Sequence, residues 1–113
     1  MFLGLEQAKP SIIKVQIFGD SMLPTFRNGD SIPFIFNKNL KFKVGDIVLA
    51  KHPYEKYELI VKRIKHIKEK ERYFLVGDNP NTNQSTDSNS FGYINGNDIL
   101  AKSEIDFPST INR

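Results

Sequence analysis

The sequence predicts a mainly β domain with little helix, folded as a small coiled antiparallel sheet or a partly open β-barrel. Gly-Asp pairs, which favour turns, recur at residues 19–20, 29–30, 45–46 and 77–78. Short runs rich in Ile, Val, Phe and Tyr lie between these turns, as strands require. No helical pattern exceeds about two turns, so little helix is expected.

Each of these runs is expected to form a strand. The first, SIIKVQIF, alternates, and the apolar positions on its one side are Ile13, Val15 and Ile17. In the second, SIPFIF, Pro33 cannot donate to a ladder and is expected to place its strand at an edge or a bulge. The remaining strands are expected at residues 46–50, 57–67, 72–78, 92–94 and 98–105.

One polar segment, DNPNTNQSTDSNS at residues 78–90, has no apolar side chain except Pro80. It is too polar to form core and is long for a simple hairpin loop. Such loops are either solvent-exposed decoration or a functional surface, and the composition leaves both open.

The length of 113 residues predicts a single domain, residues 1–113, with residues 1–10 as a candidate flexible N-terminal segment. The absence of cysteine excludes disulfides and thiolate metal sites, and two histidines argue against a histidine-rich metal site. A net charge of +3 is too small to indicate nucleic-acid binding by itself. No apolar run suits a signal peptide or a membrane span, so a soluble, cytoplasmic protein is expected, although a removed anchor would leave the same sequence.

Ser21, in the stretch GDSMLPT, is a candidate nucleophile. A serine hydroxyl is too weak an acid to ionise unaided at neutral pH, so it needs a base, and a neutral lysine can serve. The alternative, which Gly-Asp-Ser alone favours, is an ordinary turn serine.

Lys62 is the candidate base because it lies in the apolar run YELIVKRI, where Ile60 and Ile64 would share its face. A lysine on an apolar face is costly unless it loses its proton or finds a partner. The alternative is a side chain that extends along a sheet edge and keeps its amine in water. Glu58 and His66 fall on the same predicted face and leave this alternative open.

The other charged groups point to solvated positions. His52 stands beside a proline and is expected in a loop, and His66 lies in a lysine-rich strand. The basic run KRIKHIKEKER could contact phosphates, but its two glutamates dilute the charge. A nucleic-acid site would need aromatic residues interleaved with basic ones, and only Tyr73 adjoins this run.

Three segments, in order along the chain, resemble the type I signal peptidase superfamily of Ser/Lys proteases. GDSMLPT resembles its nucleophile motif, with Ser21 as the serine, and IVKRI resembles its lysine box, with Lys62 as the general base. FLVGDN at residues 74–79, followed by STDSNSFG at residues 85–92, resembles its C-terminal box. The resemblance implies the signal peptidase type of catalytic core and a serine endopeptidase that acts through an acyl-enzyme.

Within this superfamily, the compact spacing of the boxes and KHPY before VKRI are most similar to the small soluble nickel-type superoxide dismutase maturation proteases. This implies removal of an N-terminal extension from a precursor protein, with no cofactor or metal of the enzyme's own. The expected partner is that precursor or its peptide, and the nickel would belong to the substrate.

Other functions stay open beside this one. They are signal peptidase-like processing of exported preproteins, a catalytically weak scaffold and a nucleic-acid-binding β module. Self-cleaving transcriptional repressors use the same dyad but usually lack the Pro-Thr and Gly-Asp-Asn elements, so they are a more distant resemblance.

The resemblance also implies supporting roles. The Ser21 backbone N–H would bind the oxyanion, and Gly19 stands where some members carry a hydroxyl donor, so only backbone donors are available there. Ser85 would orient the lysine amine and Asp87 would hold the last loop. The residues expected to shape the pocket beside the nucleophile and fix its turn are Met22 and Pro24.

One position departs from the family pattern. Asn89 stands where the family usually has an arginine that pairs with the aspartate position, here Asp87. The departure implies a less firmly held last loop. It is consistent with lower activity, with a compensating cation such as Arg63 or Lys65, or with a deliberately changed residue.

Overall fold

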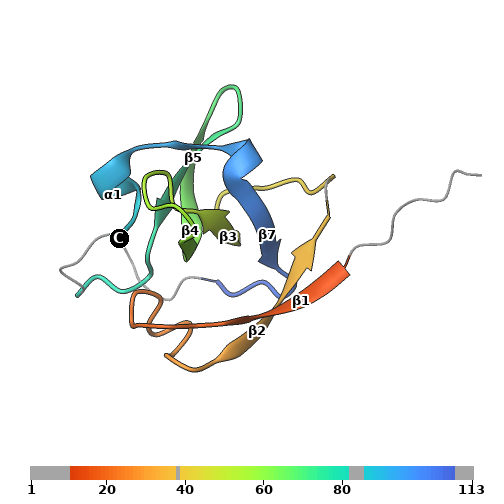
Figure 1. Cartoon of the computed structure of the whole chain (residues 1–113), viewed down its shortest axis with the longest axis vertical. Coiled ribbons are helices and arrows are strands. Elements are labelled where there is room, and N and C mark those ends of the chain that lie inside the picture. Colours follow the sequence, from red (N-terminus) through yellow and green to blue (C-terminus); the bar gives the residue numbers. More distant parts are fainter. Residues whose placement is uncertain (1–10, 38, 82–85, 109–113) are drawn as a thin grey trace, which may run out of the picture.

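The computed structural model describes residues 11–37, 39–81 and 86–108. Within these ranges, seven strands form one antiparallel sheet in the order β1-β2-β7-β3-β4-β5-β6 (Figure 1). The helices are a single α-turn, α1 (Ser88–Phe91), and a 3₁₀ turn, Gly96–Asp98. The strands are β1 (Ser11–Gln16), β2 (Ser31–Phe36), β3 (Ile47–Lys51), β4 (Leu59–Lys68), β5 (Arg72–Val76), β6 (Ile94–Asn95) and β7 (Ile99–Ser103).

The prediction of a mainly β fold with little helix is confirmed. Every run rich in branched and aromatic residues forms a strand, and Gly29 and Gly45 take the positive φ of 93° and 98° that their turns require. The candidate flexible segment, residues 1–10, lies outside the described residues. No helix in the part of the chain that the structure describes has the length and apolar character needed to cross a membrane.

The last strand lies in the middle of the sheet. β7 pairs with β2 on one side and with β3 on the other, so it joins the β1–β2 hairpin to the strands β3 to β6 (Figure 1). The expectation that Pro33 marks an edge strand is wrong, because β2 is the second strand. Pro33 fits there because pairing with β7 begins only at Phe34, and its carbonyl accepts from the Glu104 N–H.

Apolar side chains form two clusters, one on each side of the junction made by β3 and β7. One cluster gathers residues of β3, β4, β5 and β7, including Val48, Ile64 and Leu75. The other contains Met22 and Phe26, which therefore tie the turn after β1 to the rest of the fold. Burial of such side chains is the main favourable term that holds the sheet together.

A register shift between Ile64 and His66 in β4 resolves the uneven pattern of this strand. Ile64 pairs with the buried Leu75, whereas His66 pairs with Phe74 on the opposite face. The bulge therefore turns His66 outward and leaves Lys62 on the face of Ile60 and Ile64.

A buried ion pair joins β4 to the segment after β5. The Arg63 guanidinium donates from Nε and Nη2 to the two carboxylate oxygens of Asp78, each at 2.8 Å. Its Nη1 donates to the Gly45 carbonyl at 2.8 Å, and Thr25 Oγ1 donates to the same carboxylate. The Arg63–Asp78 pair thus connects the turn before β3, the segment after β5 and the turn after β1.

Replacing Arg63 by alanine is expected to lower the free energy of unfolding by about 3–5 kcal/mol, because it leaves the Asp78 carboxylate buried without its guanidinium. Asp106→Asn is the control, since its exposed carboxylate lies 3.8 Å from the Lys43 amine and such pairs contribute at most about 1 kcal/mol. Urea denaturation measures both. Equal losses in the two variants would contradict a structural role for the buried pair.

Candidate active site

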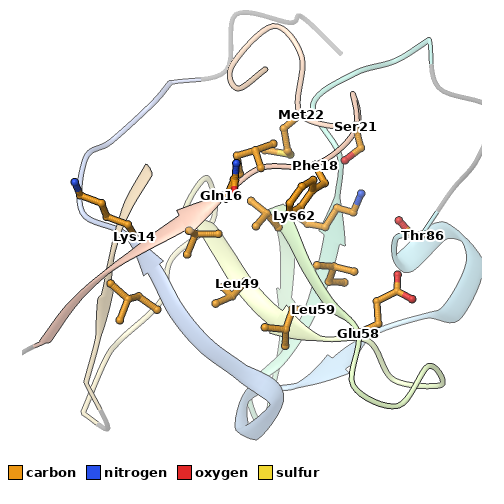
Figure 2. A pocket seen from close by; sticks show the side chains of 15 residues that line it. Lys14, Gln16, Phe18, Ser21, Met22, Leu49, Glu58, Leu59, Lys62 and Thr86 are labelled. Atoms are coloured by element: carbon orange, nitrogen blue, oxygen red, sulfur yellow. The ribbon is translucent and has the colours of Figure 1, made fainter. Parts of the chain in front are cut away.

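A pocket of about 590 Å³ lies between β1 and the first half of β4 (Figure 2). Its β1 wall and the residues that follow supply Ile13 to Phe18, and its β4 wall supplies Glu58 to Lys62. The other lining residues are Ser21, Met22, Leu49 and Thr86. The pocket therefore contains both residues of the predicted dyad.

Ser21 and Lys62 enter this pocket from different halves of the sheet. Ser21 begins the turn that follows β1, and Lys62 projects from β4 on the same face as Ile60. In Figure 2 the Ser21 hydroxyl and the Lys62 amine point into the same space. Residues 41 positions apart in the sequence thus meet in one pocket.

Lys62 is 3% exposed, and burial lowers the pKa of its amine from the ordinary 10.5. The Asp87 carboxylate acts in the opposite direction, because a nearby negative charge favours the ammonium form, but the desolvation is larger. None of the ion pairs among the described residues includes Lys62. A larger share of the amine is therefore neutral at a given pH than for a solvated lysine.

The turn that carries Ser21 is anchored by the apolar residue next to the serine. Met22 is 1% exposed, lies in the second apolar cluster and also lines the pocket. The Phe26 N–H donates to the Met22 carbonyl at 2.9 Å and closes the turn. Pro24, expected in the pocket wall, is exposed and is not among the pocket-lining residues.

The segment Gly77–Asn79 packs against the backbone of the serine turn. The Asn79 N–H donates to the Ser21 carbonyl at 2.9 Å, and its side-chain amide donates to the Asp20 carbonyl at 2.9 Å. A Cβ on Gly77 would lie 2.7 Å from the Ser21 carbonyl oxygen, closer than real Cβ atoms come. Glycine is therefore required at this position for the segment to approach the turn.

Asp87 and Asn89 lie together at the start of α1. Asp87 is the N-cap, and its Oδ1 accepts from the Asn89 N–H at 2.9 Å. Arg63, considered as a compensating cation for the missing arginine, is bonded to Asp78 instead. Ser85, expected to orient the lysine amine, lies outside the described residues.

The backbone of Gly19 is already engaged. Its N–H donates to Oδ1 of Asn28 at 2.8 Å, so this amide would have to exchange a bond before it could bind an oxyanion. No bond of the Ser21 N–H is among those found for the described residues, which leaves that amide as the candidate donor. Within the described ranges, no group of three or more His, Asp or Glu side chains could hold a metal.

Sequence reasoning missed two polar residues of the pocket, Thr86 and Glu58. Figure 2 shows the Thr86 hydroxyl on the side of the pocket that the Lys62 amine faces. By its sequence alone, Glu58 is only a polar residue that interrupts the apolar face of the strand. Its spacing of four residues from Lys62 nevertheless places both side chains on one face of an extended chain. The spacing from Lys62 could therefore have indicated that Glu58 lies in the pocket. Thr86 stands in a polar run, where no pattern indicates its position.

Comparison with known proteins places the chain in a family. The family model described as Peptidase S24-like matches residues 2–96. The matched span includes Ser21, Lys62 and Gly77–Asn79, the residues that the fold brings together. No curated protein matches the chain.

The Lys62 amine is expected to titrate below the ordinary lysine pKa of 10.5, and Asp87→Asn is expected to lower its midpoint further. The variant removes the charge that favours the ammonium form while its amide can still cap α1. NMR of the lysine Cε–Hε groups between pH 6 and 11 measures these midpoints.

Lys43 is the control in the same spectra, because its hydrogen bond to Asp46 raises its pKa. A Lys62 midpoint equal to or above that of Lys43 would contradict the burial of the amine.

Proposed function

Because the chain belongs to the Peptidase S24-like family, and so to a serine peptidase type of enzyme, we propose that it is an endopeptidase with a Ser21/Lys62 dyad. The observation that carries the proposal is a buried lysine in the pocket that holds Ser21, its pKa lowered by burial and no ion pair to it present among the described residues. Proteins rarely bear the cost of such an amine unless its neutral form has a use.

In the acylation step, the neutral Lys62 amine accepts the hydroxyl proton as Ser21 Oγ attacks the scissile carbonyl. The tetrahedral intermediate collapses to a Ser21 ester, and the Lys62 ammonium gives its proton to the leaving amine. A water molecule, deprotonated by Lys62, then hydrolyses the ester and restores the serine. This cycle needs no metal or organic cofactor.

The oxyanion of the intermediate would be stabilised by the Ser21 backbone N–H. A preformed donor of this kind stabilises charge where it develops and needs no reorganisation. The two hydrogen bonds from Asn79 hold the carbonyls of Asp20 and Ser21, and so fix the peptide plane that carries this N–H. Asn79 is in this view a positioning residue for the nucleophile turn.

The substrate would bind as an extended strand in the groove between β1 and β4. Among the described strands, β1 pairs only with β2, and residues Leu59 to Val61 of β4 pair only with β3. Each therefore presents an outer backbone edge to the pocket. Strand addition at such edges aligns a peptide backbone without demanding many side-chain contacts.

The physiological reaction we propose is removal of an N-terminal extension from a precursor protein, as in maturation of a nickel-type superoxide dismutase. The support is the resemblance of the compact GDSMLPT and KHPY…VKRI boxes to those proteases. The open groove would also accept the leader segment of an exported preprotein. Peptides from such preproteins are therefore tested together with the precursor peptides.

A second candidate function, nucleic-acid binding, gains support from the outward face of β4, β5 and β6. Tyr73 is buried, but the Tyr93 ring lies 5.1 Å from Phe74, 4.4 Å from the Lys68 amine and 6.0 Å from the Arg72 guanidinium. Aromatic rings beside cations are typical of single-strand binding surfaces. We rank this function second because these contacts already engage the ring and both cations.

Mass spectrometry of precursor peptides that span the junction of the extension tests the dyad. The chain is expected to cleave at one bond, and Ser21→Ala and Lys62→Met are each expected to reduce kcat/KM by about 10³-fold or more. The losses are not additive, since the two groups act as a unit. Cleavage that survives both substitutions would refute the dyad.

The second candidate predicts a different outcome. Fluorescence anisotropy with a labelled single-stranded oligonucleotide would then show binding that weakens with salt, is lost in Tyr93→Ala and persists in Ser21→Ala. Absence of binding at low salt, together with cleavage of a precursor peptide, would exclude it.

A further inference from the structure

We infer that the groove selects an extended segment with a lysine or arginine about four residues from the scissile bond, where it meets Glu58. This inference rests on the proposed function and adds a substrate class to it. Three features carry it: the charge of the groove, the spacing along β4 and the apolar side chains on its rim.

Glu58 is the one acidic residue among the described residues that line the pocket. Figure 2 shows its carboxylate directed into the groove, on the same side as Thr86 and the Lys62 amine. None of the ion pairs found in the described part of the chain includes Glu58. Its charge is therefore available to a cation that enters the groove.

The basic residues of the pocket do not cancel this charge. Lys14 lines the opposite wall, and in Figure 2 its amine points away from the groove and from Glu58. Lys62 stands four residues along the chain from Glu58, at the other end of the groove. Close to the Glu58 carboxylate, the field therefore favours a positively charged substrate group over a negative one.

The backbone fixes Glu58 at one end of the groove. Its carbonyl accepts from the His52 N–H at 2.9 Å, and its N–H donates to the Glu55 carbonyl at 3.1 Å. It stands four residues before Lys62, so about 13 Å separate the two along an extended chain. A substrate strand beside β4 has the same rise per residue, which places its cationic side chain about four residues from the bond at Ser21.

Large apolar side chains border the path between these two points. Phe18 is 78% exposed and Leu59 is 52% exposed, and both line the pocket. Exposed apolar groups gathered at a groove are typical of a binding surface. The segment that fits therefore combines apolar side chains near the scissile bond with a basic residue farther along.

Digestion of a proteome-derived peptide library, with cleavage sites read by mass spectrometry, tests the inference. The wild-type chain is expected to show lysine or arginine enriched at one position three to five residues from the cleaved bond. In a synthetic peptide taken from one such site, replacing this residue by glutamate is expected to lower kcat/KM about three- to ten-fold.

The variants assign the preference to a side chain. The ratio between the lysine and glutamate peptides is expected to approach one in Glu58→Gln and to invert in Glu58→Lys. Glu55→Gln, which removes an exposed carboxylate of the same loop outside the pocket lining, is expected to keep the wild-type ratio.

Two results would overturn the inference while leaving the proposed function intact. One is specific, Ser21-dependent cleavage without a charge preference in this window, and the other is a preference that persists unchanged in Glu58→Gln. Failure of the proposed function looks different, since no library peptide would then be cleaved in a Ser21-dependent manner. In that case, the affinity of the Ser21→Ala chain is measured for two synthetic extended peptides that differ only in one lysine or glutamate, and equal affinities would overturn the charge selection.

Discussion

The contact of Gly77–Asn79 with the serine turn is the interaction on which the site depends. Asn79 holds two carbonyls of that turn, Asp78 binds the guanidinium that projects from the lysine strand, and Gly77 leaves room for both. Three consecutive residues thus connect the turn that carries Ser21 to the strand that carries Lys62. The bonds of Asn79 hold backbone carbonyls, and the bond of Asp78 holds a buried guanidinium. The position of Ser21 relative to Lys62 therefore depends on how the strands and turns of the sheet pack together.

Lys62 and Arg63 are adjacent and both are buried. The free-energy cost of burying a charge is reduced in a different way for each of them. Arg63 cannot give up its proton, so it requires the two-pronged contact with Asp78. Lys62 has no paired carboxylate among the described residues, and its amine can become neutral instead. Asp87, near enough to favour the ammonium form, limits how far the pKa falls. The same strand therefore carries one permanent charge that holds the structure together and one amine that loses its proton more readily than a solvated lysine.

Much of the fold could be predicted from local patterns, while the contacts that assemble the candidate site could not. Gly-Asp turns and branched residues predict the strands that the structure describes. A lysine between Ile60 and Ile64 leaves both a buried and a solvated amine open, and the structure shows Lys62 buried. The central place of β7 is not encoded in any local period, since it depends on pairing partners far away in the sequence. The bulge that turns His66 outward, and the place of Thr86 in the pocket, likewise arise from tertiary packing. The expectation of an edge strand at Pro33 is wrong because hydrogen bonding between β2 and β7 begins one residue later, at Phe34.

The position of β7 also determines when the two parts of the sheet can join during folding. Until residues 99–103 have left the ribosome, β2 and β3 have no common neighbour, and the serine and the lysine belong to separate pieces of sheet. Long-range strand pairing of this kind is slow and comes late in folding. Before β7 pairs, the sheet does not yet connect the β1–β2 hairpin to β4, so the pocket that Ser21 and Lys62 both line is completed late in folding.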